Sequence, residues 1–416
     1  MSDAVAVSRQ DWRPMIAVGV GCLFFGYGFL IRVSPSVMVA ELMREFGVGA
    51  AILGNLSAVY LYVYALLQIP IGVLMDRVGP RRLMSAAAVV VGVGVLMFAV
   101  SDTVNGAYAG RFLIGAGCAF TWPGLLALIH HWFPMRFALL AGVGQVTGMV
   151  GAVFGQAPLA AAVEAHGWRG TMIALAGIGV VMAILIWMTA RDRRHPDSHA
   201  MTTKAALRQV ASNKQTWLSA IFGLAMTGPL LAFGGLWGVP FLSTVYGLDR
   251  PAAAGIVSLI FIGSGAGAVI LGGWSDRIGK RKPVMLIAGV LCTAALFAVI
   301  HLPELPVFAL SVLIFAMGFG GASLLLAFAT GREHNTPGTA GTAIGIVNTA
   351  VVGSGALFQP IIGIVLDLNW SGELAEGVRV YAPETFRLAL TVLPVCGILG
   401  LLAAMFSKET FCRQRT

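Results

Sequence analysis

The sequence contains few charged residues. Only 11% of its 416 residues are Asp, Glu, Lys or Arg, and 58% are hydrophobic. Because a soluble domain carries about 25% charged residues, this composition excludes an ordinary water-soluble globule. The formal net charge is +9, but the basic residues lie in short gaps between apolar segments rather than in one tail. This distribution indicates a membrane protein surrounded by lipid bilayer and argues against nucleic acid as a partner.

Cysteines and catalytic motifs are also scarce. The five cysteines form no Cys-x-x-Cys pair, and four of them lie inside apolar segments, so we expect neither disulfides nor a metal site. No Walker P-loop occurs, since Gly279-Lys280 is followed by Arg281, and there is no HExxH or GxSxG motif. We therefore expect no enzyme, no catalytic residues and no cofactor.

Long apolar segments make up most of the chain. A bilayer is crossed by a helix of about 20 apolar residues, and twelve windows of this kind are present. The first is too long for the apolar core of a signal peptide, so we interpret it as a retained span. The expected spans are residues 14–37, 50–74, 82–101, 107–130, 137–162, 170–190, 217–245, 252–274, 283–301, 305–329, 339–366 and 386–406.

The basic residues predict the orientation of these spans. With a cytoplasmic amino terminus, twenty of the 27 Lys and Arg residues lie on the cytoplasmic side, five lie opposite, and Arg32 and Arg111 fall within spans. Positive loops favour the cytoplasm, so we expect a multi-pass protein of the cell inner membrane with both termini inside. The polar segment 191–216 predicts a division into two six-helix bundles, residues 1–190 and 217–416.

The two halves share a cationic loop. Its copies read Gly72-Val-Leu-Met-Asp76-Arg77-Val-Gly79-Pro-Arg81-Arg82 and Gly272-Gly-Trp-Ser-Asp276-Arg277-Ile-Gly279-Lys280-Arg281-Lys282. A second repeat pairs Gln145 and Gln156 of span 5 with Asn348 and Gln359 of span 11, each pair eleven residues apart on one helical face. Matched sites of this kind indicate duplication and two pseudo-symmetric bundles.

These loops, the span count and the central segment resemble the major facilitator superfamily. Arg111-x3-Gly115-x-Gly117 in span 4 also resembles a recurring motif of that family. The resemblance implies an all-α membrane protein of twelve transmembrane helices, alternating access to a central solute site, and a monomer. It further implies that loop residues make contacts between the bundles that favour the outward-facing state. By position these are Asp76, Arg77 and Arg81, with Asp276 and Arg277 as a weaker second set.

The branch of the family is indicated by smaller features. Drug antiporters of this family often carry a Gly-Pro pair within span 5, whereas span 5 of this chain has no proline until Pro158, so drug efflux is less favoured. Arg32-Val-Ser-Pro and Gly167-Trp-Arg169 resemble branches that handle organic anions. The layout of span 2 and of Trp132-Phe-Pro134 resembles the branch that contains lysosomal dipeptide uniporters.

Two arginines within spans are the leading solute-binding candidates. A charge inside a span costs roughly 3 kcal/mol, so such residues usually face a cavity. The planar fork of Arg32 or Arg111 suits a carboxylate or phosphate. The alternatives are snorkelling for Arg32 and hydrogen bonds to a neighbouring span for Arg111. Polar side chains that either line the cavity or join helices complete the predicted site: Tyr60, Tyr64, Gln145 and Asn348.

We therefore expect a secondary transporter that moves a small hydrophilic, carboxylate-bearing solute, either an organic anion or a short peptide. The alternatives are a drug or metabolite efflux antiporter and a solute sensor of the same fold that does not transport. No embedded acid is evident in the spans. The sequence thus leaves three coupling mechanisms open. The protein is a uniporter, a proton symporter that uses groups at the span ends or on the solute, or a transporter with a sodium site built from amides and carbonyls.

Overall fold

The computed structural model describes residues 12–191, 203–303, 305–375 and 377–414. Within these residues, 11 helical stretches are long and apolar enough to cross a membrane. One of them, Leu139–Thr189, has 51 residues, roughly twice the length that a bilayer requires. Gly167, with φ 72° and ψ 157°, breaks this stretch so that it can cross twice. The predicted all-helical membrane protein is confirmed.

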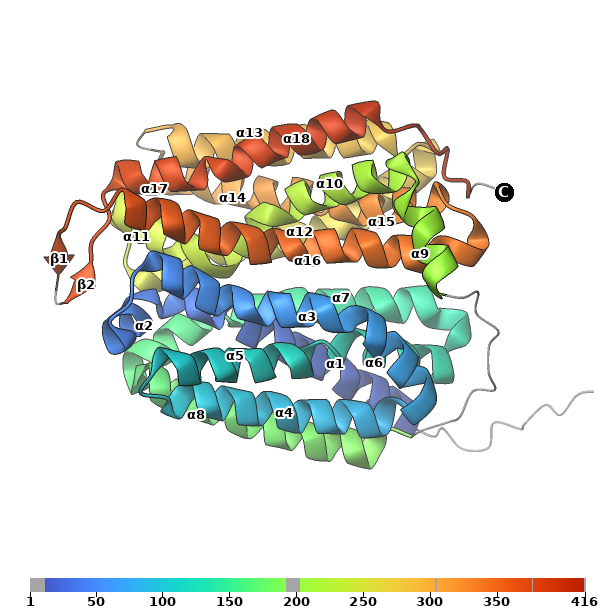
Figure 1. Ribbon diagram of the computed structural model, residues 1–416, viewed down its shortest axis with the longest axis horizontal. Coiled ribbons are helices and arrows are strands. Elements are labelled where there is room, and N and C mark those ends of the chain that lie inside the picture. Colours follow the sequence, from blue (N-terminus) through green and yellow to red (C-terminus); the bar gives the residue numbers. More distant parts are fainter. Residues whose placement is uncertain (1–11, 192–202, 304, 376, 415–416) are drawn as a thin grey trace, which may run out of the picture.

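The helices form two groups that lie side by side (Figure 1). The N-terminal group contains the following elements: α1 (Arg13–Val33), η1 (Ser34–Val37), α2 (Val39–Phe46), α3 (Ala50–Val78), α4 (Pro80–Val100), α5 (Val104–Cys118), α6 (Thr121–Trp132), η2 (Pro134–Arg136), α7 (Phe137–Phe154) and α8 (Ala157–Thr189). Within this group α4 packs against α5 and α8, and α1 packs against α7.

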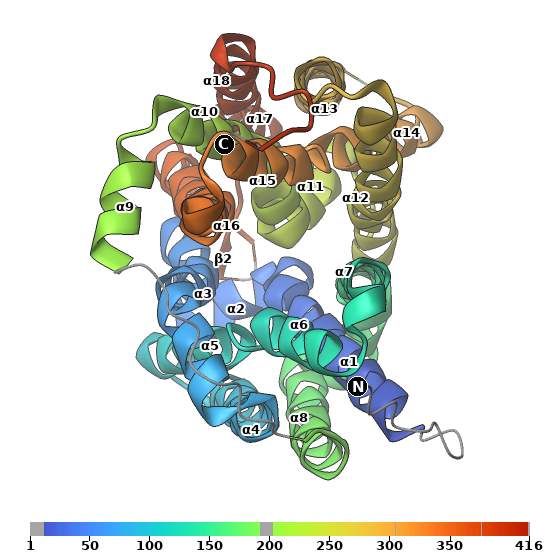
Figure 2. The same ribbon diagram turned by 90° about the vertical axis from the view of Figure 1, so that its right-hand side faces the viewer.

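The C-terminal group repeats this arrangement. It contains the following elements: α9 (Thr203–Ala211), α10 (Lys214–Gly228), η3 (Pro229–Trp237), α11 (Gly238–Tyr246), α12 (Arg250–Ile278), α13 (Lys282–His301), α14 (Val307–Gly321), α15 (Leu324–Glu333), η4 (Pro337–Thr339), α16 (Ala340–Leu368), β1 (Leu374–Ala375), β2 (Val378–Arg379), α17 (Pro383–Leu390) and α18 (Val392–Phe406). The two short strands pair antiparallel, with Leu374 opposite Arg379. Seen end on, α3 lies beside α16 and α7 beside α12 where the groups meet (Figure 2).

Several predicted spans are broken helices rather than single ones. Span 4 is divided into α5 and α6, span 10 into α14 and α15, and span 12 into α17 and α18, while span 7 runs through α10, η3 and α11. Pro123, Pro229 and Pro394 stand in the first turn of the segment after a break. A proline has no N–H to donate, so it fits the start of a new segment better than the interior of an old one.

The two ends of the molecule differ. The hairpin end contains β1, β2, α2 and the first residues of α3, whereas the basic end contains the two cationic loops. At the hairpin end α3 and α16 cross closely, because Gly54 lies against the carbonyl of Gln359 and Gly363 against the carbonyl of Ala50. Small residues allow two membrane helices to approach in this way. The predicted central segment 191–216 lies partly outside the described residues, and its described part forms α9 and the start of α10.

Candidate functional site

A cavity of about 300 Å³ lies between the two groups. Helices α1, α3, α6 and α7 line it on one side, and α10, η3, α12, α15 and α16 line it on the other. Most of the lining is apolar and aromatic. The polar side chains among the described lining residues are Arg32, Tyr64, Gln145, Thr227, Ser264 and Asn348. A few polar groups in an apolar cleft between two helix groups are typical of a small-molecule site.

Arg32 lies in the last turn of α1 and is surrounded by aromatic rings. Its guanidinium carbon is 4.2 Å from the ring centre of Phe29, 5.1 Å from that of Tyr64 and 5.3 Å from that of Tyr60. Its Nε also donates a hydrogen bond to the Tyr60 hydroxyl, at 3.3 Å. Aromatic faces attract a cation, but no carboxylate in the described part of the chain pairs with Arg32. Within the described residues the guanidinium is therefore held by aromatic faces and a hydroxyl rather than by an ion pair.

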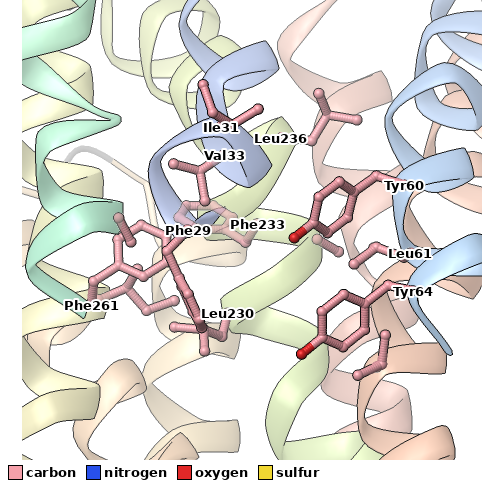
Figure 3. Packing of buried hydrophobic residues seen from close by; sticks show 14 of the residues in the cluster. Phe29, Ile31, Val33, Tyr60, Leu61, Tyr64, Leu230, Phe233, Leu236 and Phe261 are labelled. Carbon is pink, nitrogen blue, oxygen red and sulfur yellow. The ribbon is translucent and has the colours of Figure 1, made fainter. Parts of the chain in front are cut away.

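Tyr60 and Tyr64 stand one helical turn apart on α3. Their rings stack at 6.0 Å with an interplanar angle of 16°. Both hydroxyls point from α3 toward the interior, on the side where Leu230 of η3 lies (Figure 3). Tyr64 lines the cavity, whereas Tyr60 is fully buried and reaches the site through Arg32. The structure thus brings both predicted tyrosines to Arg32, but only one of them to the cavity wall.

Gln145 and Asn348 lie at matching places in the two groups. A short 3-10 turn that begins with proline precedes α7 and also α16, and each amide stands eight residues after its helix begins, at Phe137 and at Ala340. Both side chains line the cavity, one from each group. The two amides that the internal repeat pairs in the sequence therefore lie on opposite sides of the cavity.

Arg111 does not line this cavity. It is fully buried in α5, where Nη1 donates to the carbonyl of Ile31 at 3.2 Å and Nη2 donates to the carbonyl of Ser57 at 3.0 Å. Its guanidinium also lies 5.3 Å from the ring centre of Tyr60. Arg111 therefore joins the backbones of α1 and α3 beside Arg32. Of the two predicted arginines, Arg32 therefore lies at the cavity, and Arg111 bonds to the backbone next to Arg32.

Sequence reasoning missed two hydroxyls and the backbone of η3. Thr227 and Ser264 line the cavity, but a lone hydroxyl in an apolar helix gives no sequence signal because it can bond to its own backbone, as Thr227 does to the Gly223 carbonyl at 2.6 Å. The wide π-helical turns of η3 receive side-chain amides from both groups. Gln156 donates to the Gly234 carbonyl at 3.0 Å, and Gln359 donates to the Leu231 carbonyl at 2.8 Å.

The predicted conformational-switch residues lie at the basic end. The side chains of Asp76 and Arg77 fall outside the described part of the structure. Arg81 donates to the carbonyl of Trp187 at 2.9 Å and lies over the ring of the same residue. Asp276 pairs with Arg281 at 2.6 Å, and Arg277 is exposed. These bonds lie within one group each, and the role of the five residues in switching stays a prediction.

Arg281 of the second cationic loop is the centre of an ionic network. It pairs with Glu333, the last residue of α15, at 2.9 Å, and Glu409 accepts hydrogen bonds from the backbone N–H groups of Arg281 and Lys282. Burial alone would lower the pKa of Arg281, but its hydrogen bonds to Glu333 and Asp276 raise that pKa above its ordinary value. The network attaches the C-terminal tail to the basic end of the C-terminal group.

Comparisons with known proteins give relatives that cover nearly the whole chain. The chain is 26% identical over 424 residues to a probable L-galactonate transporter of Escherichia coli, covering 92% of this chain and 87% of that protein. It is 23% identical to a probable sulfoacetate transporter of Cupriavidus necator, covering 88% and 90% of the two chains. It is 25% identical to a gentisate transporter of Corynebacterium glutamicum, covering 86% and 82%.

Solved structures show the same fold. A bacterial homologue of the human lysosomal transporter Spinster, in an inward-facing and unoccupied conformation, superposes with a TM-score of 0.76 at 18% identity, covering 98% of this chain and 100% of the other. A sequence model of the Major Facilitator Superfamily matches residues 16–360 and, in a second match, residues 231–410. Because these matches span far more than half of the chain, this protein belongs to the Major Facilitator Superfamily.

Proposed function

We propose that this secondary transporter moves a small organic anion and that Arg32 binds its carboxylate. One observation carries the proposal: Arg32 is the one charged side chain among the described residues that line the cavity. A charge away from bulk water requires a counter-charge, and among the described residues Arg32 is surrounded by aromatic faces and tyrosine hydroxyls, with no carboxylate paired to it. A carboxylate would supply that counter-charge and would match the guanidinium fork with two hydrogen bonds.

The rest of the cavity indicates the size and chemistry of the part of the solute that lies beyond its carboxylate. Its volume of about 300 Å³ lies at the lower limit for ligand pockets, which favours a small acid over a long peptide. Gln145 and Asn348 would bind hydroxyl or amide groups from opposite sides, and the aromatic wall would cover an apolar or ring-shaped body. The solutes named for three relatives (galactonate, sulfoacetate and gentisate) each carry an acidic group, which supports the anion proposal.

We further propose that bundles 1–190 and 217–416 move against each other about this cavity. The positive-inside rule makes the basic end cytoplasmic, with both termini inside and the protein in the inner membrane of a bacterial cell. In this proposal the close α3–α16 crossing shuts the outer side, and we assign the structure to the inward-facing state. Contacts of Asp76, Arg77 and Arg81, with Asp276 and Arg277 as the weaker set, would stabilise the opposite state. The transporter is proposed to act as a monomer.

The test is a thermal-shift titration of the detergent-purified protein with galactonate, sulfoacetate, gentisate, a dipeptide and a cationic drug. We expect an organic anion to raise the melting temperature and Arg32→Gln to weaken its binding roughly 10- to 100-fold, the worth of a charge-assisted hydrogen bond. The matched control is Arg136→Gln, which removes the same charge from an exposed position at the basic end. Flux of the binding anion into proteoliposomes separates a transporter from a sensor that only binds.

Two results would overturn the proposal. Stabilisation by an anion that is unchanged in Arg32→Gln would place the anion site elsewhere. Stabilisation by the cationic drug alone would favour the efflux antiporter.

A further inference from the structure

Helix α3 begins without a capping side chain of its own. Its N-cap residue is Gly49, and the first N–H groups of a helix have no partner within that helix. The side chain of Asp367, in the last turn of α16, takes this place from the other group. Its Oδ1 accepts a hydrogen bond from the N–H of Ala50 at 3.1 Å, and its Oδ2 accepts one from the N–H of Ala51 at 2.9 Å. A carboxylate of the C-terminal group thus caps a helix of the N-terminal group.

Two residues in and just after β2 hold this carboxylate in position. The hydroxyl of Tyr381 donates to Asp367 Oδ1 at 2.5 Å and accepts from the N–H of Ala50 at 3.0 Å. Arg379 of β2 pairs with the same carboxylate oxygen at 3.1 Å. Gly49 allows the approach, because a Cβ at that position would lie 2.5 Å from the carboxylate of Asp367. The positive end of the α3 dipole adds a further attraction for the negative charge.

We propose that this cap, formed by Asp367 on the N-terminus of α3, is a latch that keeps the hairpin end closed. If the groups separate at this end, the N–H groups of Ala50 and Ala51 lose the oxygens of Asp367, and Ala50 also loses its bond to the hydroxyl of Tyr381. The latch therefore favours the closed hairpin end and has to be released in each transport cycle. The Glu41–Arg250 ion pair, at 2.5 Å, is a further contact between the groups at this end, but it caps no helix. The latch does not depend on which solute is carried.

The experiment measures the separation of the groups at the hairpin end without any solute. Spin labels are attached to cysteines introduced at Asn105 and Phe308, two exposed positions at that end, one in each group. The background lacks the native cysteines, and distances are recorded by electron paramagnetic resonance in lipid nanodiscs. We expect Asp367→Ala to increase the population with the longer distance roughly 5- to 30-fold, as loss of a helix cap implies.

Asp249→Ala is the matched control. Asp249 caps α12 at the same end, and its Oδ1 accepts from the N–H of Ala252 at 2.7 Å, but both residues belong to one group. We expect its distance distribution to equal that of the parent. Asp367→Asn keeps the size of the side chain, loses the charge and should give a smaller shift in the same direction. Tyr381→Phe should do the same.

The comparison stays decisive if Asp367→Ala does not fold, because Asp367→Asn and Tyr381→Phe are conservative changes. The latch would be overturned if the foldable Asp367 variants and Tyr381→Phe gave the same distance distributions as Asp249→Ala and the parent. Since no solute is present, this result would leave the proposal about the carboxylate untouched.

Discussion

Arg32 and Arg111 are two guanidinium groups with different surroundings. Arg32 is surrounded by aromatic rings and tyrosine hydroxyls and faces the cavity. Arg111 is occupied by two backbone carbonyls, those of Ile31 and Ser57, and lies outside the cavity. Because Ile31 directly precedes Arg32 in α1, the bond from Arg111 fixes the backbone from which Arg32 extends. We infer that Arg111 positions Arg32, the proposed solute-binding residue, rather than contacting the solute.

Lysine substitutions distinguish these two roles. Arg32→Lys should weaken binding of the organic anion roughly tenfold, because an ammonium cannot form the paired hydrogen bonds of the fork and one such bond is worth about 1.4 kcal/mol. Arg111→Lys should change affinity only slightly, since one ammonium can still bond to a carbonyl of α1 or α3. The dissociation constant is measured by tryptophan fluorescence titration. Equal losses of affinity in the two variants would assign both arginines to the solute.

The α3–α16 crossing brings the two groups into close contact near the hairpin end. Gly54 and Gly363 place the two backbones in contact near the hairpin end. Farther along the same helices, Tyr64 and Asn348 face the cavity. One pair of helices therefore supplies both a tight contact and part of the cavity wall, and we expect a change in their crossing to alter access to the cavity.

Adding one methyl group tests this contact. The Cβ of Gly363→Ala would meet the Ala50 carbonyl, and backbone cannot move aside as a side chain can. Overpacking of this kind costs roughly 1–3 kcal/mol, and we expect it to shift the equilibrium toward the state that is open at the hairpin end. Gly353→Ala in the same helix is the control, because its Cβ would meet nothing within 4 Å. The same spin-label distance measures both, and identical distributions would show that the contact does not control opening.

At the scale of the whole molecule, the contacts at the two ends differ. In this structure the hairpin end is joined by bonds between the groups, such as those of Asp367 and of Glu41. At the basic end, Asp276 and Glu333 pair with Arg281 inside the C-terminal group. Under alternating access the cationic loops would meet only after the hairpin end opens.

A substitution in the first cationic loop tests this arrangement. Asp76→Asn should slow transport and leave solute affinity largely intact, because it destabilises a state rather than the site. Asp276→Asn is the comparison and should have the smaller effect, since Asp276 is already paired with Arg281 in its own group. Flux into proteoliposomes and solute affinity are measured on the same preparations. Parallel loss of flux and affinity by Asp76→Asn in folded protein would argue for a direct role in binding.

The sequence predicted the fold closely but not the breaks within the helices. The length of the apolar windows reflects the thickness of the bilayer, so the spans could be placed without knowledge of any contact. Proline did not reveal the breaks. Pro70 and Pro360 lie inside the continuous helices α3 and α16, whereas Pro123 and Pro229 stand in the first turn of new segments. Neighbouring helices can satisfy the backbone groups that a proline frees, and those neighbours are not visible in sequence.

The sequence by itself determined the membrane class, the repeat and the amide pair of Gln145 and Asn348, because composition and spacing are local properties of the chain. The tertiary structure alone decided which embedded arginine meets the cavity and which carboxylate caps α3. Those outcomes depend on partners far apart in the chain: Arg111 bonds to Ile31 across 80 positions, and Asp367 bonds to Ala50 across 317. No local pattern records such a distance, since it is set by how the two groups of helices pack against each other.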